Sequence, residues 1–286
     1  MLKQKILARP DILIYNLSVY RNQILRNMII RTVMNSSSSY NILHLHGGRF
    51  FDIQLTKKWY FRFLLKYHLR RFNKIFCLTN EQYGAVVDIL KSAKNVKKIN
   101  NYVELPNERL LDKKDDVLNL LYIGRLHPLK GLREAINAIY QIKSERIRFW
   151  IIGSGELETE LVQIKDERIV FLGKKIGADK ETYLSKAHVF LLPSWSEGLP
   201  YALLEAAAYG LALVGTQVGA VDQVIYHGKN GFFIKPGDVT NLKEMIEILL
   251  ADREETLKMG RESRKICEER FSIQGLKQIY DKILED

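Results

Sequence analysis

The sequence predicts an α/β protein of two domains, each built on a parallel sheet, with the N-terminal domain incomplete. From residue 117 onward, short apolar runs alternate with segments of helical periodicity. These runs are mainly apolar, which is typical of parallel strands covered on both faces. The charge also divides: residues 1–110 hold 19 Lys and Arg against 6 Asp and Glu, and residues 111–286 hold 25 against 27. We therefore expect domains at 1–110 and 111–286.

The second domain is expected to alternate strands and helices in chain order. Strands are predicted at residues 117–123, 147–152, 169–172, 188–192, 211–214 and 232–234. Helices are predicted at residues 131–142, 156–164, 179–186, 200–209, 241–251, 253–269 and 272–284. The final helix is expected to pack back on the N-terminal domain.

The first domain contains fewer elements. Strands are predicted at residues 11–16, 41–46, 75–79 and 97–103, and helices at 18–34 and 57–72. These strands are too few for a full doubly wound domain. The charged segment 104–116, which contains Pro106, is expected to be the boundary.

Composition narrows the class of protein. Among 286 residues, 47% are hydrophobic and 27% are charged, as in ordinary globular domains. No stretch reaches the roughly 20 apolar residues of a membrane span, and Arg9-Pro10-Asp11 interrupts the N-terminus before a signal-peptide core. Cys77 and Cys267 lack metal-ligand spacing and are expected to be buried, reduced thiols. We expect a cytoplasmic protein.

Two strand ends carry glycine-rich turns. Gly124 ends the first strand of the second domain, Arg125 and Lys130 follow it, and Gly131 opens a helix. Two cations beside a helix N-terminus suit a diphosphate; the alternative is a surface loop with solvated cations. Residues 153–155, Gly-Ser-Gly, form a similar but less specific turn.

Two carboxylates follow the fourth strand. Glu197 lies in the loop before Pro200, and Glu205 lies within the next helix. Gly198 allows close backbone approach to a ligand, and hydroxyl groups of a sugar or ribose are natural partners of carboxylates. The alternative is a solvated loop glutamate and a chance helical one. Glu205, however, sits among leucines and alanines, where an unpaired carboxylate is costly.

These segments resemble the donor-binding domain of the family-4 retaining glycosyltransferases, which have the GT-B architecture of two facing Rossmann-like domains. Glu197 and Glu205 match the family's glutamate-x-seven-glutamate motif, and residues 124–131 match its diphosphate motif. Residues 214–232 match the segment that follows. The resemblance covers roughly residues 97–286.

The resemblance implies roles for individual residues. Arg125 and Lys130 would neutralise the donor diphosphate and the charge on the leaving group. Glu205 would bind the ribose hydroxyls, and Glu197, with the backbone at residues 198–199, would hold the donor sugar. The remaining donor-binding residues would be Gly124, Gly153, Gly155, Gly173, Ile176, Gly198 and Leu199, with the loop 173–176 against the base.

The resemblance also implies a reaction. A hexose-type sugar would move with retention from a UDP- or GDP-sugar to a lipid-linked or polysaccharide acceptor, in cell-surface polysaccharide synthesis. No metal and no cofactor are expected. We expect no covalent intermediate, because no carboxylate of residues 1–110 is placed to attack the anomeric carbon of the sugar. Asp52 is the only one near His46 in the sequence. The leaving phosphate would then act as the base.

The N-terminal domain resembles the family less closely. His46 ends a predicted strand before Gly47-Gly48 and matches a histidine-glycine pair that faces the reacting sugar; the alternative is a packed histidine, which is the reading for His44. Residues 1–40 lack the family's glycine-rich loop. A second hypothesis is therefore a truncated, inactive or partner-dependent nucleotide-sugar-binding subunit, with a partner chain supplying the missing strands. A sugar-nucleotide epimerase ranks lower, because no further acid-base residues are identifiable.

The basic first domain suggests a surface for an anionic partner. In the predicted helix 57–72, Lys58, Arg62, Lys66 and Arg70 recur at steps of four among aromatic residues. Such a helix suits an anionic bilayer, where a lipid-linked acceptor would be presented, so we expect a peripheral location at the inner face of the plasma membrane. The alternative is a core helix with a solvated basic face. No nucleic-acid partner is expected, since no reader motif is present.

Overall fold

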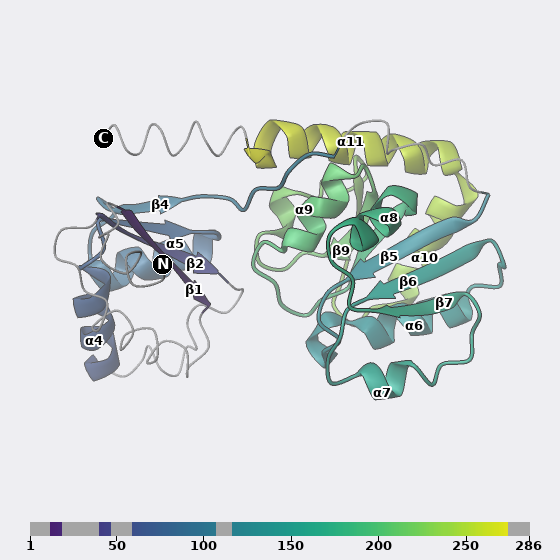
Figure 1. Cartoon of the computed structure of the whole chain (residues 1–286), viewed down its shortest axis with the longest axis horizontal. Coiled ribbons are helices and arrows are strands. Elements are labelled where there is room, and N and C mark those ends of the chain that lie inside the picture. Colours follow the sequence, from purple (N-terminus) through teal and green to yellow (C-terminus); the bar gives the residue numbers. More distant parts are fainter. Residues whose placement is uncertain (1–11, 19–39, 47–58, 107–115, 274–286) are drawn as a thin grey trace, which may run out of the picture. The chain divides into compact units, whose positions relative to one another are not determined.

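The computed structural model describes residues 12–18, 40–46, 59–106 and 116–273. The chain divides into two compact units, Met1–Asn100 and Asn101–Asp286, each with a parallel sheet (Figure 1). The predicted α/β class is therefore confirmed. The sequence placed the division at 110/111, but residues 101–106 are bonded to the second unit: the Val103 amide donates to the Phe271 carbonyl at 2.9 Å.

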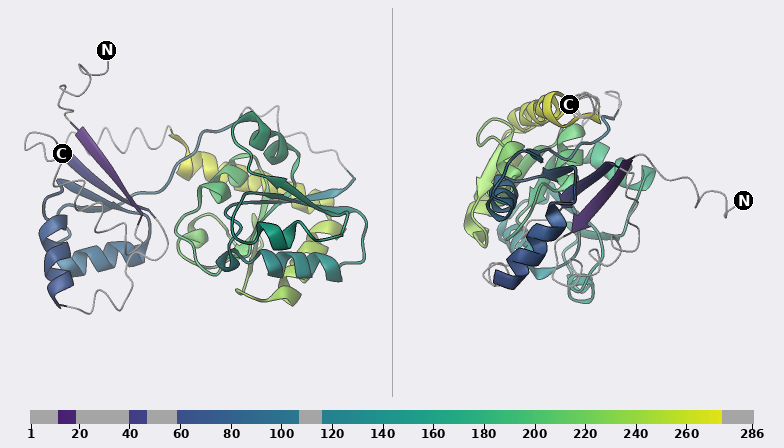
Figure 2. Two further views of the ribbon diagram at one scale, coloured as in Figure 1. Left: turned by 60° about the horizontal axis from the view of Figure 1, so that its bottom comes forward. Right: turned by 90° about the vertical axis from the view of Figure 1, so that its left-hand side faces the viewer.

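The N-terminal unit has a four-stranded parallel sheet in the order β1-β2-β3-β4. Its strands are β1 (Ile12–Ser18), β2 (Tyr40–His46), β3 (Lys74–Cys77) and β4 (Val96–Lys98), and its helices are α4 (Trp59–Leu69) and α5 (Asn80–Leu90). Buried residues of β2 and β3 pack against both helices, which lie on the same face of the sheet (Figure 2). The predicted helix 18–34 and residues 47–58 lie almost wholly outside the described residues.

Helix α5 was not predicted from the sequence. It begins with a capping box, in which the Gln82 amide donates to Thr79 Oγ1 at 3.1 Å and the Thr79 amide donates to Gln82 Oε1 at 3.3 Å. Thr followed three residues later by Gln is a recognised helix start. The predicted strand 97–103 is shorter, because only β4 joins the sheet and Val103 forms an isolated bridge with Ser272.

The C-terminal unit has a six-stranded parallel sheet in the order β10-β9-β8-β5-β6-β7. Its strands are β5 (Leu118–Ile123), β6 (Ile147–Ile152), β7 (Ile169–Gly173), β8 (Val189–Leu192), β9 (Ala212–Thr216) and β10 (Gly231–Ile234). Its helices are η2 (Pro128–Lys130), α6 (Leu132–Gln141), α7 (Glu158–Leu161), α8 (Ala178–Lys186), α9 (Tyr201–Ala208), η3 (Val221–Gln223), α10 (Val239–Ala251) and α11 (Arg253–Phe271).

The strands of this sheet contribute apolar side chains to a hydrophobic core on each face. Leu118, Leu120 and Tyr122 of β5 pack in one cluster with α6 and α10, whereas Leu121 packs in a second with α8, α9 and α11. Successive side chains of a strand point to opposite faces, so a strand buried on both is apolar throughout. Figure 1 shows the helices on both sides of the sheet.

The predicted helix 156–164 is the clearest difference in this unit. Only α7 is helical, and the chain after it continues in tight turns, with the Ile164 amide bonded to the Leu161 carbonyl. Leu157 and Leu161 are buried but Val162 is exposed, so the segment has too few core contacts for a longer helix. The predicted helix 272–284 lies almost wholly outside the described residues. Cys77 and Cys267 are free and buried, as predicted.

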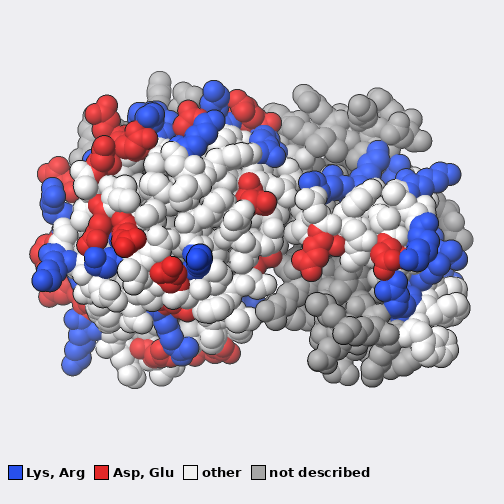
Figure 3. Space-filling model, turned by 180° about the vertical axis from the view of Figure 1, so that it is seen from behind, with Lys and Arg blue, Asp and Glu red and all other residues white. Residues whose placement is uncertain are grey.

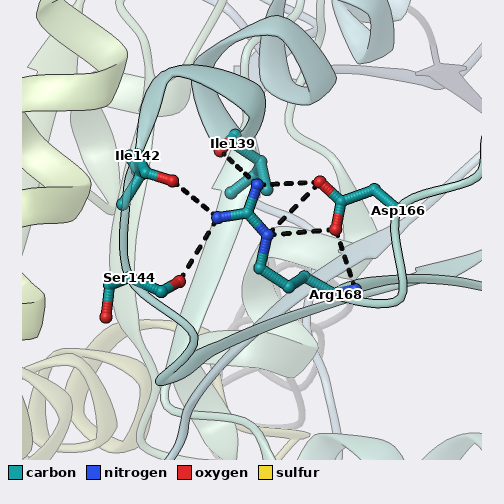
Figure 4. A network of polar contacts seen from close by, with 5 residues as sticks. All are labelled: Ile139, Ile142, Ser144, Asp166 and Arg168. Atoms are coloured by element: carbon teal, nitrogen blue, oxygen red, sulfur yellow. Dashed lines mark hydrogen bonds and ion pairs between the residues drawn. The ribbon is translucent and has the colours of Figure 1, made fainter.

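The amino edge of the sheet is held by one arginine (Figure 4). Arg168 precedes β7 and forms an ion pair with Asp166, with both side chains largely buried. Its Nη1 donates to the Ile142 carbonyl at 2.6 Å, and its Nη2 donates to the Ile139 carbonyl at 3.1 Å. The guanidinium therefore satisfies carbonyls at the C-terminal end of α6, where a helix leaves acceptors unpaired.

Candidate functional site

The topology of the six-stranded sheet marks one place for a ligand. From β5 the chain moves outward through β6 and β7, then returns to the other side of β5 with β8 and continues to β9 and β10. The strand order therefore reverses between β5 and β8. Open parallel sheets bind ligands outside the carboxyl ends of the strands at such a reversal. The loops that leave β5 and β8 carry Arg125, Lys130 and Glu197.

These two loops pack directly against each other. Gly131, which ends η2, has a φ of +68°, and a Cβ at this position would lie 2.0 Å from the Pro193 carbonyl oxygen. The Trp195 amide donates to the Leu129 carbonyl at 2.9 Å. Both the left-handed backbone and the close contact require glycine at position 131.

This packing brings a predicted cation and a predicted carboxylate together. Lys130 Nζ donates to Glu197 Oε1 at 2.6 Å, and the Glu197 side chain is only 8% exposed. The Tyr122 hydroxyl donates to the Arg125 carbonyl at 2.9 Å. Burial raises the pKa of Tyr122, the charge of Glu197 raises it further, and the charge of Arg125 lowers it. Charges of both signs thus act on one buried phenol.

The backbone after Glu197 is held by its carbonyls. The Gly198 carbonyl accepts from the Ala220 amide at 2.8 Å, and the Leu199 carbonyl accepts from Asn101 Nδ2 at 2.6 Å. Both residues are buried, and within the described residues their amides donate no hydrogen bond. A buried amide without a partner is unfavourable, so these N–H groups suit an acceptor on a ligand.

Glu205 is also paired with a lysine. Its Oε1 accepts from Lys180 Nζ at 2.6 Å, and both side chains are about a quarter exposed. Lys180 lies in the first turn of α8, after the loop that leaves β7. The sequence indicated that Glu205 needs a partner, but no motif identified Lys180, which is one charge in the run Asp179-Lys180-Glu181.

The glycines at the ends of β5 and β6 have a packing role. The Gly124 amide donates to the Ile152 carbonyl at 3.0 Å, and a Cβ on Gly153 would lie 1.8 Å from the Gly124 oxygen. A Cβ on Gly155 would lie 2.4 Å from the Leu126 oxygen. Glycine at these positions lets the two loops approach each other.

The loop after β7 is more open. Gly173 has a φ of +65°, with no atom within 4 Å of a Cβ placed there, and Ile176 is 73% exposed. The Gly153 amide donates to the Gly173 carbonyl at 2.9 Å, so this loop starts beside the ends of β5 and β6. The surface expected to face a base is thus accessible and lies at the same edge of the sheet.

His46 belongs to the other unit. It is the last residue of β2, and its side chain and the following Gly47-Gly48 lie outside the described residues. The ring of His44 packs edge-on against Phe76, with 6.2 Å between ring centroids, which agrees with a structural role. The role of His46 stays a prediction.

The geometry of the C-terminal unit agrees with a known family. Residues 118–252, from the start of β5 to just past α10, match the model for glycosyl transferases group 1. The C-terminal unit contains a glycosyl transferases group 1 domain. The predicted family resemblance is therefore confirmed.

Individual relatives of this glycosyltransferase domain extend the match. The chain is 25% identical over 241 residues to N-acetyl-alpha-D-glucosaminyl L-malate synthase of Bacillus anthracis, covering 78% of this chain and 62% of the relative. It is 30% identical over 199 residues to the capsular polysaccharide biosynthesis glycosyltransferase CapM of Staphylococcus aureus, covering 64% of this chain and 52% of the relative. The chain thus spans about half to three fifths of their lengths.

Solved structures show the same fold. The Anabaena protein HepE in complex with UDP superposes with a TM-score of 0.75 at 18% identity, covering 94% of this chain and 78% of HepE. Sucrose-phosphate synthase from Thermosynechococcus elongatus superposes with a TM-score of 0.74 at 20% identity, covering 96% and 74%. The predicted GT-B fold is confirmed by these two likenesses.

The described residues contain neither a cluster of metal ligands nor a membrane-spanning helix. In that part of the chain, no three His, Cys, Asp or Glu residues form a group that could hold a metal ion. No helix of the described ranges is long and apolar enough to cross a membrane.

Proposed function

We propose that the chain is a retaining glycosyltransferase that moves a hexose-type sugar from a UDP- or GDP-sugar to a lipid-linked or polysaccharide acceptor. The main support for the proposal is the position of two Lys–Glu pairs, Lys130–Glu197 and Lys180–Glu205, at the carboxyl edge of a glycosyl transferases group 1 domain. The first pair lies where the strand order reverses. One relative is named for capsular polysaccharide biosynthesis, and the structural neighbour HepE forms a complex with UDP; both support the substrate class.

The diphosphate of the donor would bind at the loop after β5. Arg125 is exposed, and Lys130 lies two residues before the start of α6, so both cations are placed to bind phosphate oxygens at this helix N-terminus. A lysine that exchanges its bond to Glu197 for a bond to phosphate would release that carboxylate for the sugar hydroxyls. The amides of Gly198 and Leu199 are then donors for the sugar end.

Catalysis would be electrostatic. Arg125 and Lys130 would stabilise the charge that develops on the departing nucleoside diphosphate, a contribution that is made mainly in the transition state. Retention would follow from attack on the same face as the departing phosphate, which acts as the base. No covalent glycosyl-enzyme and no metal are proposed, and His46 would face the reacting sugar.

A binding screen followed by a transfer assay tests this function. A thermal-shift series with UDP, GDP and their hexose conjugates should raise the melting temperature for one base, because a ligand of the folded state stabilises it. The same donor should release its nucleoside diphosphate in the presence of a lipid-linked saccharide. Binding without transfer would support the alternative of a partner-dependent subunit, and absence of any binding would refute the proposal.

The acceptor side is proposed to meet an anionic bilayer through α4. The sequence left open whether the aromatic residues of this helix are core; Trp59, Phe63 and Tyr67, at steps of four, are 79%, 70% and 50% exposed. Arg62 instead turns to Asp88 of α5, at 2.8 Å. Figure 3 shows Lys and Arg gathered on one face of this unit with few Asp and Glu. An exposed aromatic row beside basic residues is typical of helices that lie at a membrane interface.

Vesicle binding tests this surface. Wild-type protein should sediment with vesicles that contain anionic phosphatidylglycerol and bind less to neutral phosphatidylcholine vesicles. The Phe63→Ser variant should lose most of this binding, whereas Tyr140→Ser, an exposed aromatic on α6 of the other unit, should not. Equal binding of all three proteins would contradict the role of α4.

A further inference from the structure

The two Lys–Glu pairs have the same construction. In each, one lysine donates to Oε1 of one glutamate at 2.6 Å. Within the described part of the chain, neither carboxylate accepts a hydrogen bond at Oε2. Each pair therefore holds a carboxylate by one oxygen and leaves the other for a ligand. Lys130, Glu197 and Glu205 have proposed roles toward the donor, but Lys180 has none.

We propose that Lys180 is a positioning residue for the nucleoside half of the donor, holding Glu205 so that its second oxygen accepts the ribose hydroxyls. Lys180 would keep its bond to Glu205 when the donor binds, whereas Lys130 is proposed to exchange its bond to Glu197 for one to phosphate. This inference rests on the proposed function, since it assumes a nucleotide donor, and it extends that function to a residue outside the family's motifs.

Glu205 needs such a holder because its own helix provides none. It lies on α9, where the neighbouring Leu204 and Ala206 are buried, and its own side chain is 28% exposed. A glutamate loses rotamer freedom when it is fixed, so an unrestrained side chain would pay that cost on binding. A charge-assisted bond from Lys180 fixes the carboxylate beforehand.

Lys180 also connects two parts of the nucleoside site. It lies on α8, which follows the open loop with Gly173 and Ile176, whereas Glu205 lies on α9. The Lys180–Glu205 bond joins the start of α8 to α9. The surface proposed for the base is thereby kept at a fixed distance from the carboxylate proposed for the ribose.

Calorimetric titration with matched nucleotides tests the inference. UDP, GDP and their 2′,3′-dideoxy analogues would be titrated into the wild type, Lys180→Met, Glu205→Gln and the double variant. We expect Lys180→Met to weaken binding of the preferred ribonucleotide about tenfold, the value of one bond to a charged group. Its affinity for the dideoxy analogue should stay within about twofold, because that analogue has no ribose hydroxyl to lose. The double variant should bind no more weakly than Glu205→Gln, since both changes remove the same contact.

Controls separate positioning from general damage. Lys186→Met removes an exposed charge from the last turn of the same helix and should bind both nucleotides as the wild type does. Lys180→Gln, a polar second variant, repeats the test if the methionine variant does not fold. Equal losses for the ribonucleotide and the dideoxy analogue, or no loss at all, would overturn the role of Lys180. A wild type that binds none of the four nucleotides would overturn the proposed function itself.

Discussion

The two edges of the six-stranded sheet use charged side chains in different ways. At the amino edge, Nε, Nη1 and Nη2 of Arg168 all donate hydrogen bonds, to Asp166 and to three backbone carbonyls (Figure 4). At the carboxyl edge, Lys130 and Lys180 each contact one oxygen of one glutamate. The first arrangement is saturated, whereas the second keeps both donors and acceptors for a ligand.

Charged residues that stabilise the fold can thus be distinguished from those proposed to bind the donor. A saturated, largely buried guanidinium has no donor left for a substrate. Removing it takes away the donors of the Ile142 and Ser144 carbonyls and of Asp166 Oδ2. A single Lys–Glu bond is exchanged at little cost when a diphosphate or a hydroxyl arrives. The same types of residue thus stabilise the protein at one edge and are proposed to bind its donor at the other.

The largest expected effect comes from the carboxyl edge. Lys130→Ala should lower kcat/KM for transfer about 100-fold to 1,000-fold, because it removes a cation that stabilises the leaving diphosphate. The free energy of unfolding should fall by about 1–3 kcal/mol, because the largely buried Glu197 carboxylate loses its partner. Steady-state kinetics and urea denaturation measure the two quantities. If kcat/KM fell only because the variant is unfolded under the assay conditions, the proposed difference between the two edges would be contradicted.

At the amino edge the expected pattern is reversed. Arg168→Ala should lower the free energy of unfolding by about 2–3 kcal/mol, because several charge-assisted bonds are lost together. Donor affinity, measured at a temperature where the variant is folded, should stay within twofold of the wild type.

Arg133 is the matched control for this arginine. It pairs with Glu160 on the exposed surface, where both side chains are about half exposed. Arg133→Ala should leave the melting temperature unchanged, since exposed ion pairs contribute little. A similar loss of stability in both variants would show that the saturated network at the amino edge has no special weight.

Backbone strain should also differ between a loop and a helix. Gly173→Ala should destabilise the protein by about 1 kcal/mol, because φ is +65° there and an L-residue disfavours this conformation. Gly84→Ala in α5, where a Cβ is equally free of contacts, should stabilise by about 0.5–1 kcal/mol. Thermal unfolding compares the two; the same sign for both would contradict the strain at the carboxyl edge.

The smallest expected effect is a pH dependence of the Arg168 network. Hydrogen bonds from Arg168 lower the pKa of Asp166 below its usual 3.8. The ion pair therefore stabilises the protein fully above that value, and the stabilisation is lost as the pH falls through the lowered pKa. The stability difference between wild type and Arg168→Ala should shrink when the pH drops from about 6 to below about 3. A difference independent of pH would mean that the backbone carbonyls alone account for the network.

The sequence predicted the strands of the C-terminal unit because a strand buried on both faces is mainly apolar. The fully buried strand Val189–Leu192 lies where it was expected, and Gly131 lies at the turn before α6. The motif residues Lys130 and Glu197 do lie together. Their direct bond was not predicted, because spacing along the chain does not show which side chains meet across two loops.

Other features depend on packing that periodicity does not report. The order of strands, which marks the ligand position between β5 and β8, follows from helix packing on both faces. Lys180 is one charge in a polar helix, and only the fold places it against Glu205. In the sequence Arg168 likewise cannot be distinguished from a surface arginine, and only the fold places it beside the C-terminal end of α6. Helix α5 had a readable signal in Thr79 and Gln82, which shows that capping residues carry information that apolar periodicity lacks.

One calorimetric comparison tests directly whether the carboxyl edge of the sheet binds the nucleotide donor while the amino edge stabilises the fold. UDP and GDP would be titrated into the wild type, Lys130→Ala and Arg168→Ala under conditions where all three are folded. We expect one nucleotide to bind the wild type and Arg168→Ala equally, and to bind Lys130→Ala at least tenfold more weakly because one bond to a phosphate is lost. Equal affinity for the wild type and Lys130→Ala would contradict it.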